Sequence, residues 1–195
     1  MAKKIAVVAP MGMDPEIDIL RQIIEGVFIR NADKVKESDT EVVFHLLNAG
    51  FTDIDYFGYL CFNVRNDYEL FEAALELGEE DYDALVVHCA FDSMLEPLRQ
   101  ALDIPVVGVL QSGMLLATMM GHRFGVVTFS KTVVPYIEDI IARYGLRDKA
   151  VPVRSSESTG EEMLMGLADA HELIEAFSAP ARECIADGAE VLVPG

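Results

Sequence analysis

The stretch 82–109 limits most strictly what this chain can fold into. Its first part, 84–87, is a short, valine-rich apolar run, typical of a strand buried on both faces. An amphipathic segment (95–102) follows, and then a second apolar run (106–109). The order of strand, loop, helix and strand predicts a parallel β–α–β unit.

The same alternation continues along the chain and predicts an α/β fold with mainly parallel sheets flanked by helices. Strands are expected at 3–9, 41–47, 84–87, 106–109, 124–128, 151–153 and 190–193. Helices are expected from Asp14 to about Arg30, and over 66–78, 92–102, 112–120, 130–145 and 159–178, with Pro180 breaking or kinking the last one.

A faint internal repeat divides the chain. Residues 4–10 resemble 123–129, and 83–88 can be aligned with 190–195. In the second alignment Cys89 corresponds to the position after Gly195, so we expect a longer protein with a catalytic partner of Cys89 at that place. We assign 1–110 to a first α/β lobe, completed by chain returning from the C-terminus, and 111–195 to a second, truncated lobe.

Charge and cysteine content exclude several classes of protein. The net charge of −18 disfavours nucleic-acid binding. No apolar run approaches the roughly 18 residues of a membrane helix, and the first apolar segment breaks at Pro10, too early for a signal peptide. Three widely spaced cysteines fit reduced thiols in a cytoplasmic protein better than a disulfide framework.

Cys89 is the main candidate for chemistry because it follows the strand 84–87, at the sheet edge where α/β proteins bind ligands. A packed, inert cysteine is the alternative. We expect Asp92 or Ser93 to cap the next helix, whose N-terminus would favour a Cys89 thiolate. His88 should point to the opposite face of the strand and be structural.

Other patterns are weaker. His45, His88, Cys61 and Cys89 lack metal-ligand spacing, so no metal is expected, and no phosphate-binding loop is present. The helix 112–120 is apolar nearly all round and should lie inside the molecule or at a subunit interface. The aromatic-rich stretch 48–65 could be a lid, an oligomer contact, or a loop packed on the core.

Several segments resemble the Asp/Glu/hydantoin racemase superfamily. They are Cys89-x-x-Asp92-x-x-Leu95, 102–108, Gly121-His122-Arg123-Phe124-Gly125-Val126-Val127-Thr128, Tyr144-Gly145-Leu146, and 188–195, which is similar to the family segment before its second cysteine. The run 89–146 is most similar to the hydantoin and allantoin racemase branch. The resemblance implies two pseudo-symmetric lobes with the active site between them.

The resemblance also implies a cofactor-independent racemase or isomerase, in which Cys89 and a second thiol exchange the α-proton of a small amino-acid-like or hydantoin-like substrate. The substrate would be anionic or amide-bearing, and the protein a homodimer or higher homo-oligomer. The implied substrate-binding residues are Pro10, Met11, Gly12, Ala90, Phe91, Asp92, Thr128, Phe129 and Ser130. Asp92 and Ser130 could equally be helix caps.

The loop 9–13 departs from the hydantoin branch because it lacks polar Asn and Thr or Ser side chains. Two alternatives therefore stay open. One is a one-thiol decarboxylase or maleate-type cis–trans isomerase of the same superfamily. The other is a non-catalytic α/β protein that binds a small molecule.

Overall fold

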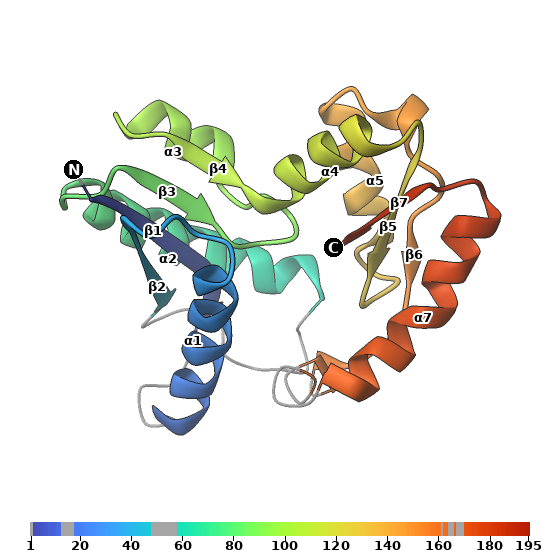
Figure 1. Cartoon of the computed structure of the whole chain (residues 1–195), viewed down its shortest axis with the longest axis horizontal. Coiled ribbons are helices and arrows are strands. Elements are labelled where there is room, and N and C mark those ends of the chain that lie inside the picture. The colour runs from blue at the N-terminus through green and yellow to red at the C-terminus, as the bar shows by residue number, and fades with distance from the viewer. Residues whose placement is uncertain (1, 13–17, 48–57, 161, 164–165, 167–169) are drawn as a thin grey trace. The chain divides into compact units, whose positions relative to one another are not determined.

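The computed structural model describes residues 2–12, 18–47, 58–160, 162–163, 166 and 170–195. Within these ranges the chain forms parallel sheets flanked by helices, which confirms the predicted α/β class (Figure 1). It divides into two compact units, residues 1–52 with 61–109 and residues 53–60 with 110–195. The expected helix start at Asp14 and the aromatic residues of 51–57 lie outside the described residues.

The first unit is built on a four-stranded parallel sheet of order β2-β1-β3-β4. Its strands are β1 (Lys3–Gly12), β2 (Thr40–Leu47), β3 (Ala84–Val87) and β4 (Val106–Gly108). In β3, Val86 lies beside Val7 of β1 on one side and Val107 of β4 on the other. β3 is therefore an interior strand, as its short apolar run predicted.

Three helices accompany this sheet: α1 (Asp18–Asp33), α2 (Leu60–Gly78) and α3 (Leu95–Ala101). The buried face of α2 carries Leu70, Ala74 and Leu77 at helical spacing. They share one buried cluster with Leu85 of β3 and Leu98 of α3, both 0% exposed. Burying an aliphatic side chain of this size contributes about 1.5–3 kcal/mol, so this cluster fixes β3 against the helices.

The second unit contains a three-stranded parallel sheet of order β6-β5-β7. Its strands are β5 (Phe124–Thr128), β6 (Arg154–Ser155) and β7 (Val191–Pro194), and its longer helices are α4 (Val109–Met120), α5 (Val134–Arg143) and α7 (Ala170–Ala186). Every residue of β5 is buried, as expected of a central parallel strand. Strand β6 begins later than the strand predicted at 151–153. Before Arg154, only Ala150 forms a bridge to β5.

Close packing of α7 on β5 depends on Gly125. A Cβ at this position would lie 2.6 Å from Cβ of Cys184, which is 0% exposed. Cys184 shares a buried cluster with Val127, Val151 and Ala189. It is thus a packed core residue, and α7 lies along β5 in Figure 1.

Helix α4 differs from its prediction. It begins at Val109, directly after β4, rather than at Ser112. Leu110, Met114 and Ala117 are buried, whereas Leu115, Leu116, Met119 and Met120 are 48–83% exposed. The helix therefore does not lie inside its unit, and one of its faces is an exposed apolar surface.

One further expectation about helices was wrong. α2 begins at Leu60, so the last part of the stretch expected to be irregular is helical. α7 continues through Pro180 to Ala186, so Pro180 does not break the helix, and a kink there stays a prediction. The Ser178 hydroxyl in this helix donates to the Ile174 carbonyl at 2.6 Å. No helix among the described ranges is long and apolar enough to cross a bilayer.

Replacing Leu85 by alanine should lower the free energy of unfolding of the first unit by about 2–5 kcal/mol, because it empties a fully buried position. Urea denaturation monitored by circular dichroism measures the loss of free energy of unfolding. Val64→Ala is the matched control, since Val64 on α2 is 73% exposed and should change stability by no more than about 0.5 kcal/mol. Equal losses in the two variants would contradict the burial of β3.

Candidate active site

Cys89 lies just after β3, where the chain leaves the sheet in a tight turn. The Asp92 amide donates to the Cys89 carbonyl at 3.0 Å, and the Leu95 amide donates to the Asp92 carbonyl at 3.2 Å. Asp92 and Met94 both have positive φ angles, 48° and 54°. Non-glycine residues in this region cost free energy and cluster at functional sites.

The thiol of Cys89 has two hydrogen-bond partners in this turn. The Phe91 amide donates to Sγ at 3.4 Å, and the Ser93 hydroxyl lies 3.3 Å from Sγ. Both partners can donate to a thiolate, which lowers the pKa of the Cys89 thiol. The turn thus holds the sulfur atom in a fixed position.

Burial has a larger effect on the pKa of the Cys89 thiol than these hydrogen-bond donors. Desolvation raises the pKa of the Cys89 thiol above its ordinary value, and the nearby Asp67 carboxyl raises it further. The helix expected to follow, α3, begins at Leu95 and has seven residues, so help from its dipole stays a prediction. The raised pKa of the Cys89 thiol favours its protonated form.

The expected helix cap is also absent. The N-cap residue of α3 is Met94, with no side-chain hydrogen bond to the helix. Asp92, 6% exposed, instead packs its carboxyl against the α-carbon of Gly108 in β4, where a Cβ would lie 2.7 Å from Asp92 Cγ. The missing side chain of Gly108 therefore makes room for Asp92.

Sequence reasoning missed Asp67, a residue of α2 whose carboxyl is near enough to Ser93 and Cys89 to interact with both. Partial burial raises the pKa of the Asp67 carboxyl, and its Oδ1 has no hydrogen-bond partner within the described parts of the chain. The available signal was a polar pair, Asn66 and Asp67, beside a buried apolar stripe, which was interpreted as a helix start. A half-buried carboxyl with a shifted pKa next to a thiol is one indication of a functional site.

The other predicted residues of the first unit lie at the same sheet edge. The His88 amide donates to the Val8 carbonyl at 2.8 Å, so the ends of β1 and β3 are neighbours. Pro10, Met11 and Gly12 form the end of β1, and the register with β2 shifts between Ala9 and Gly12. Ala90 and Phe91 belong to the turn after Cys89, and Phe91 is 8% exposed.

His88 points away from this turn, as expected. Its ring meets Phe28 at 4.3 Å and Phe44 at 5.9 Å between centroids, both in edge contacts. Burial lowers the pKa of His88, so it is neutral in the folded protein. An apolar cavity of about 290 Å³ adjoins these rings. The role of His88 in this cluster is structural.

In the second unit Thr128, Phe129 and Ser130 follow one another at the carboxyl end of β5. Thr128 is 0% exposed and its Oγ1 has no hydrogen-bond partner among the described residues. Ser130 does not cap α5, whose N-cap is Val133. Its Oγ lies 2.7 Å from Oγ1 of Thr132, which donates to the Gly58 carbonyl at 2.6 Å.

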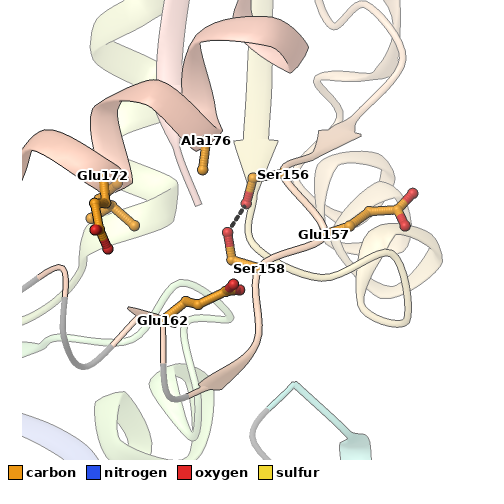
Figure 2. A pocket seen from close by; sticks show the side chains of 7 residues that line it. Ser156, Glu157, Ser158, Glu162, Glu172 and Ala176 are labelled. Atoms are coloured by element: carbon orange, nitrogen blue, oxygen red, sulfur yellow. Dashed lines mark hydrogen bonds between the residues drawn. The ribbon is translucent and has the colours of Figure 1, made fainter.

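A polar cavity of about 220 Å³ lies near this end of β5 and was not predicted (Figure 2). Ser156 and Ser158 line it side by side, with their hydroxyl oxygens hydrogen-bonded at 2.8 Å, as Figure 2 shows. The Ser156 amide donates to the Thr128 carbonyl at 2.9 Å. Glu162 lines it while forming the predicted capping box with Thr159. Its described lining does not include Cys89.

The arrangement around Cys89 is suited to proton transfer. It offers a held thiol, a backbone N–H, a hydroxyl and a carboxyl within one unit. Among the described residues no group of three His, Cys, Asp or Glu side chains is placed to hold a metal ion.

Comparison with known proteins gives the context of this site. The family model described as Asp/Glu/Hydantoin racemase matches residues 63–195. A hydantoin racemase of Pseudomonas sp. (strain NS671) is 36% identical over 78 residues, which cover 40% of this chain and 31% of that protein. The matched stretches span less than half the length of the curated relatives.

Solved structures share the fold over nearly the whole chain. Allantoin racemase from Klebsiella pneumoniae is 20% identical, with a TM-score of 0.81 over 99% of this chain and 74% of that one. Allantoin racemase from Pseudomonas fluorescens is 25% identical, with a TM-score of 0.80 over 98% of this chain and 76% of that one.

Iodoacetamide at pH 7 should alkylate Cys61 before Cys89, because Cys61 is exposed and burial raises the pKa of the Cys89 thiol. An acid with a raised pKa ionises only at higher pH, so the main rise in Cys89 alkylation should come above the ordinary thiol range of about 8.5. Mass spectrometry of each site against pH measures this. In urea the two thiols should react alike. Rapid alkylation of Cys89 in the folded protein at pH 7 would contradict this prediction.

Proposed function

We propose that this chain, which belongs to the Asp/Glu/hydantoin racemase family, carries the thiol of a racemase acting on a small amino-acid-like or hydantoin-like substrate. The observation that supports this most is the placement of Cys89 at the carboxyl end of β3, held by Phe91 N–H and the Ser93 hydroxyl. The reaction needs no cofactor, because acid–base groups alone can exchange an α-proton.

In the proposed reaction, one thiolate removes the proton α to a carbonyl and a second thiol returns a proton on the opposite face of the planar carbanion. Cys89 is one of these groups. Its raised pKa suits the protonating role, and reversal of the reaction gives it the role of base. The second thiol of the proposal follows Gly195, where the internal repeat places the equivalent of Cys89.

Substrate contacts are proposed from both units. In the first unit they are Pro10, Met11, Gly12, Ala90, Phe91 and Asp92, and in the second Thr128, Phe129 and Ser130. The buried, unpaired Oγ1 of Thr128 supports its part, since a buried hydroxyl without a partner is costly until a ligand or water pairs with it. A hydroxyl and backbone N–H groups suit an amide or carboxylate of the substrate.

Assembly and location belong to the same proposal. A homodimer or higher homo-oligomer is supported by the exposed apolar face of α4, formed by Leu115, Leu116, Met119 and Met120. Cytoplasmic location is supported by the three free cysteines. The net charge of −18 argues against a nucleic-acid partner.

A one-thiol decarboxylase of the same superfamily is the second candidate. It is favoured by the same raised pKa, because such an enzyme needs a thiol that protonates a carbanion and no base on the opposite face. A maleate-type isomerase or a non-catalytic binding protein are the remaining alternatives.

Cys89→Ala should abolish α-proton exchange of 5-substituted hydantoins in D₂O, followed by NMR on the full-length protein. We expect a loss of about 10²–10⁴-fold, the usual contribution of a positioned acid–base group. Cys61→Ala is the matched control, since Cys61 is exposed and should leave exchange unchanged.

The outcomes separate the candidates. Loss of both exchange and optical inversion in Cys89→Ala supports the racemase. Full exchange in Cys89→Ala overturns the catalytic assignment. Release of CO₂ from an α-substituted malonate by the unaltered protein, without racemisation of any hydantoin, would favour the decarboxylase.

A further inference from the structure

Two hydroxyl groups in the turn after β5 form a hydrogen-bonded network with the backbone. Oγ of Ser130 lies 2.7 Å from Oγ1 of Thr132, and the Thr132 hydroxyl donates to the Gly58 carbonyl at 2.6 Å. The Thr132 amide also donates to Oγ of Ser130, at 3.3 Å. All three residues belong to the second unit. The network thus connects a proposed substrate contact, Ser130, to two residues outside the proposed site.

The directions of these hydrogen bonds follow from the number of protons available. A carbonyl oxygen can only accept, so the single hydroxyl proton of Thr132 is directed to Gly58. Oγ1 of Thr132 can then only accept from Ser130, so the Ser130 hydroxyl is the donor in the 2.7 Å contact. The hydroxyl proton of Ser130 is therefore already used within the protein.

Close packing holds Gly58 against the same turn. Gly58 is buried and has a φ angle of 91°, a conformation that residues with side chains rarely adopt. A Cβ at this position would lie 2.8 Å from the Phe129 ring and 3.2 Å from Cβ of Ser130. The backbone can approach this closely because residue 58 is a glycine, and its carbonyl is thereby kept within reach of Thr132.

Oγ of Ser130 retains one position for a further partner. A hydroxyl oxygen has two lone pairs, and the Thr132 amide takes one of them. Within the described parts of the chain, no hydrogen bond uses the other. Ser130 is partly exposed, so a ligand can reach this lone pair. A group that binds there must bring its own proton.

We propose that Ser130 accepts a hydrogen bond from an N–H group of the substrate, and that Thr132 is the positioning residue that fixes Ser130 as an acceptor. A carboxylate or carbonyl oxygen has no proton to offer and would meet the Ser130 lone pair without a hydrogen bond. An unpaired polar contact of this kind disfavours such a ligand relative to one with an N–H group. The second unit therefore selects substrates with a ring or amide N–H over substrates that carry only carboxylates.

The acceptor role of Ser130 deepens the proposed function and rests on it for the identity of the site. The proposed contacts suit an amide or a carboxylate, whereas the proton directions at Ser130 favour the N–H of an amide. The α-substituted malonate of the decarboxylase alternative offers two carboxylates and no N–H. The network thus favours the racemase over the decarboxylase on grounds that do not involve the Cys89 thiol.

Neutron diffraction from a deuterium-exchanged crystal of the full-length protein tests the proton directions without any substrate. The Ser130 deuterium should lie between Oγ of Ser130 and Oγ1 of Thr132, and the Thr132 deuterium should point to the Gly58 carbonyl. A Ser130 deuterium directed away from Thr132 overturns the proposal.

Calorimetric titration tests the selectivity, with 5-benzylhydantoin and benzylmalonate as the two probes. Ser130→Ala should weaken binding of the hydantoin by about three- to tenfold, the usual effect of one hydrogen bond between neutral groups, and leave the affinity for benzylmalonate unchanged. Thr132→Val should improve binding of benzylmalonate relative to the hydantoin, because it releases the Ser130 proton for donation to a carboxylate. Thr132→Ser keeps the hydroxyl and should restore the selectivity of the unaltered protein.

Ser178→Ala is the matched control for these variants. The Ser178 hydroxyl also donates to a backbone carbonyl, that of Ile174 on α7, and its loss should change neither affinity. An equal effect of Ser130→Ala on both probes overturns the acceptor role. Failure of both probes to bind the unaltered protein overturns the proposed substrate class and the role of Ser130 with it.

Failure of the acceptor role and failure of the proposed function give different results. If Cys89→Ala loses α-proton exchange while Ser130→Ala weakens both probes equally, the function stands and the acceptor role fails. If Ser130→Ala weakens only the hydantoin while Cys89→Ala retains exchange, the acceptor role stands and the catalytic assignment fails.

Discussion

Pairing of β3 between β1 and β4 is the interaction on which the candidate site depends. Ladders on both sides and the burial of Leu85 and Val87 hold the strand in one register. A slip of one residue would turn these side chains to the opposite face of the sheet. The same slip would change where the chain leaves β3 and so move Cys89. The position of the thiol is thus set by the core of the unit, several residues away from the sulfur atom itself.

Burial that secures the strand also determines the chemistry at its end. A thiol at an open sheet edge would ionise near its ordinary pKa, whereas desolvation raises the pKa of Cys89 and keeps it neutral. The turn compensates in part through Phe91 N–H and Ser93, and the αL conformations of Asp92 and Met94 are the conformational cost of that turn. Fixed position and low intrinsic acidity therefore come from the same packing.

The sequence was sufficient to predict elements whose periodicity is set by burial. β3, β5 and the apolar stripe of α5 were predicted close to where they lie, because an interior strand or an amphipathic helix leaves an apolar pattern. The capping box of Thr159 and Glu162 was predictable because both partners are local. The capping role of Asp92 or Ser93 was misjudged because the rule describes isolated helices, whereas here the turn after β3 sets where α3 begins.

Asp67 shows why part of the site could not be predicted. The polar pair Asn66 and Asp67 does not distinguish a site residue from a helix start, because an acidic residue beside Asn66 is an ordinary helix-start pattern. Its meaning comes from α2 packing through Leu70 and Ala74 onto the cluster that also holds β3. That packing brings the Asp67 carboxyl near Ser93, where partial burial raises its pKa. In a chain of net charge −18, most carboxylates are expected to be solvated, and the informative one is the carboxylate that the packing has partly removed from water.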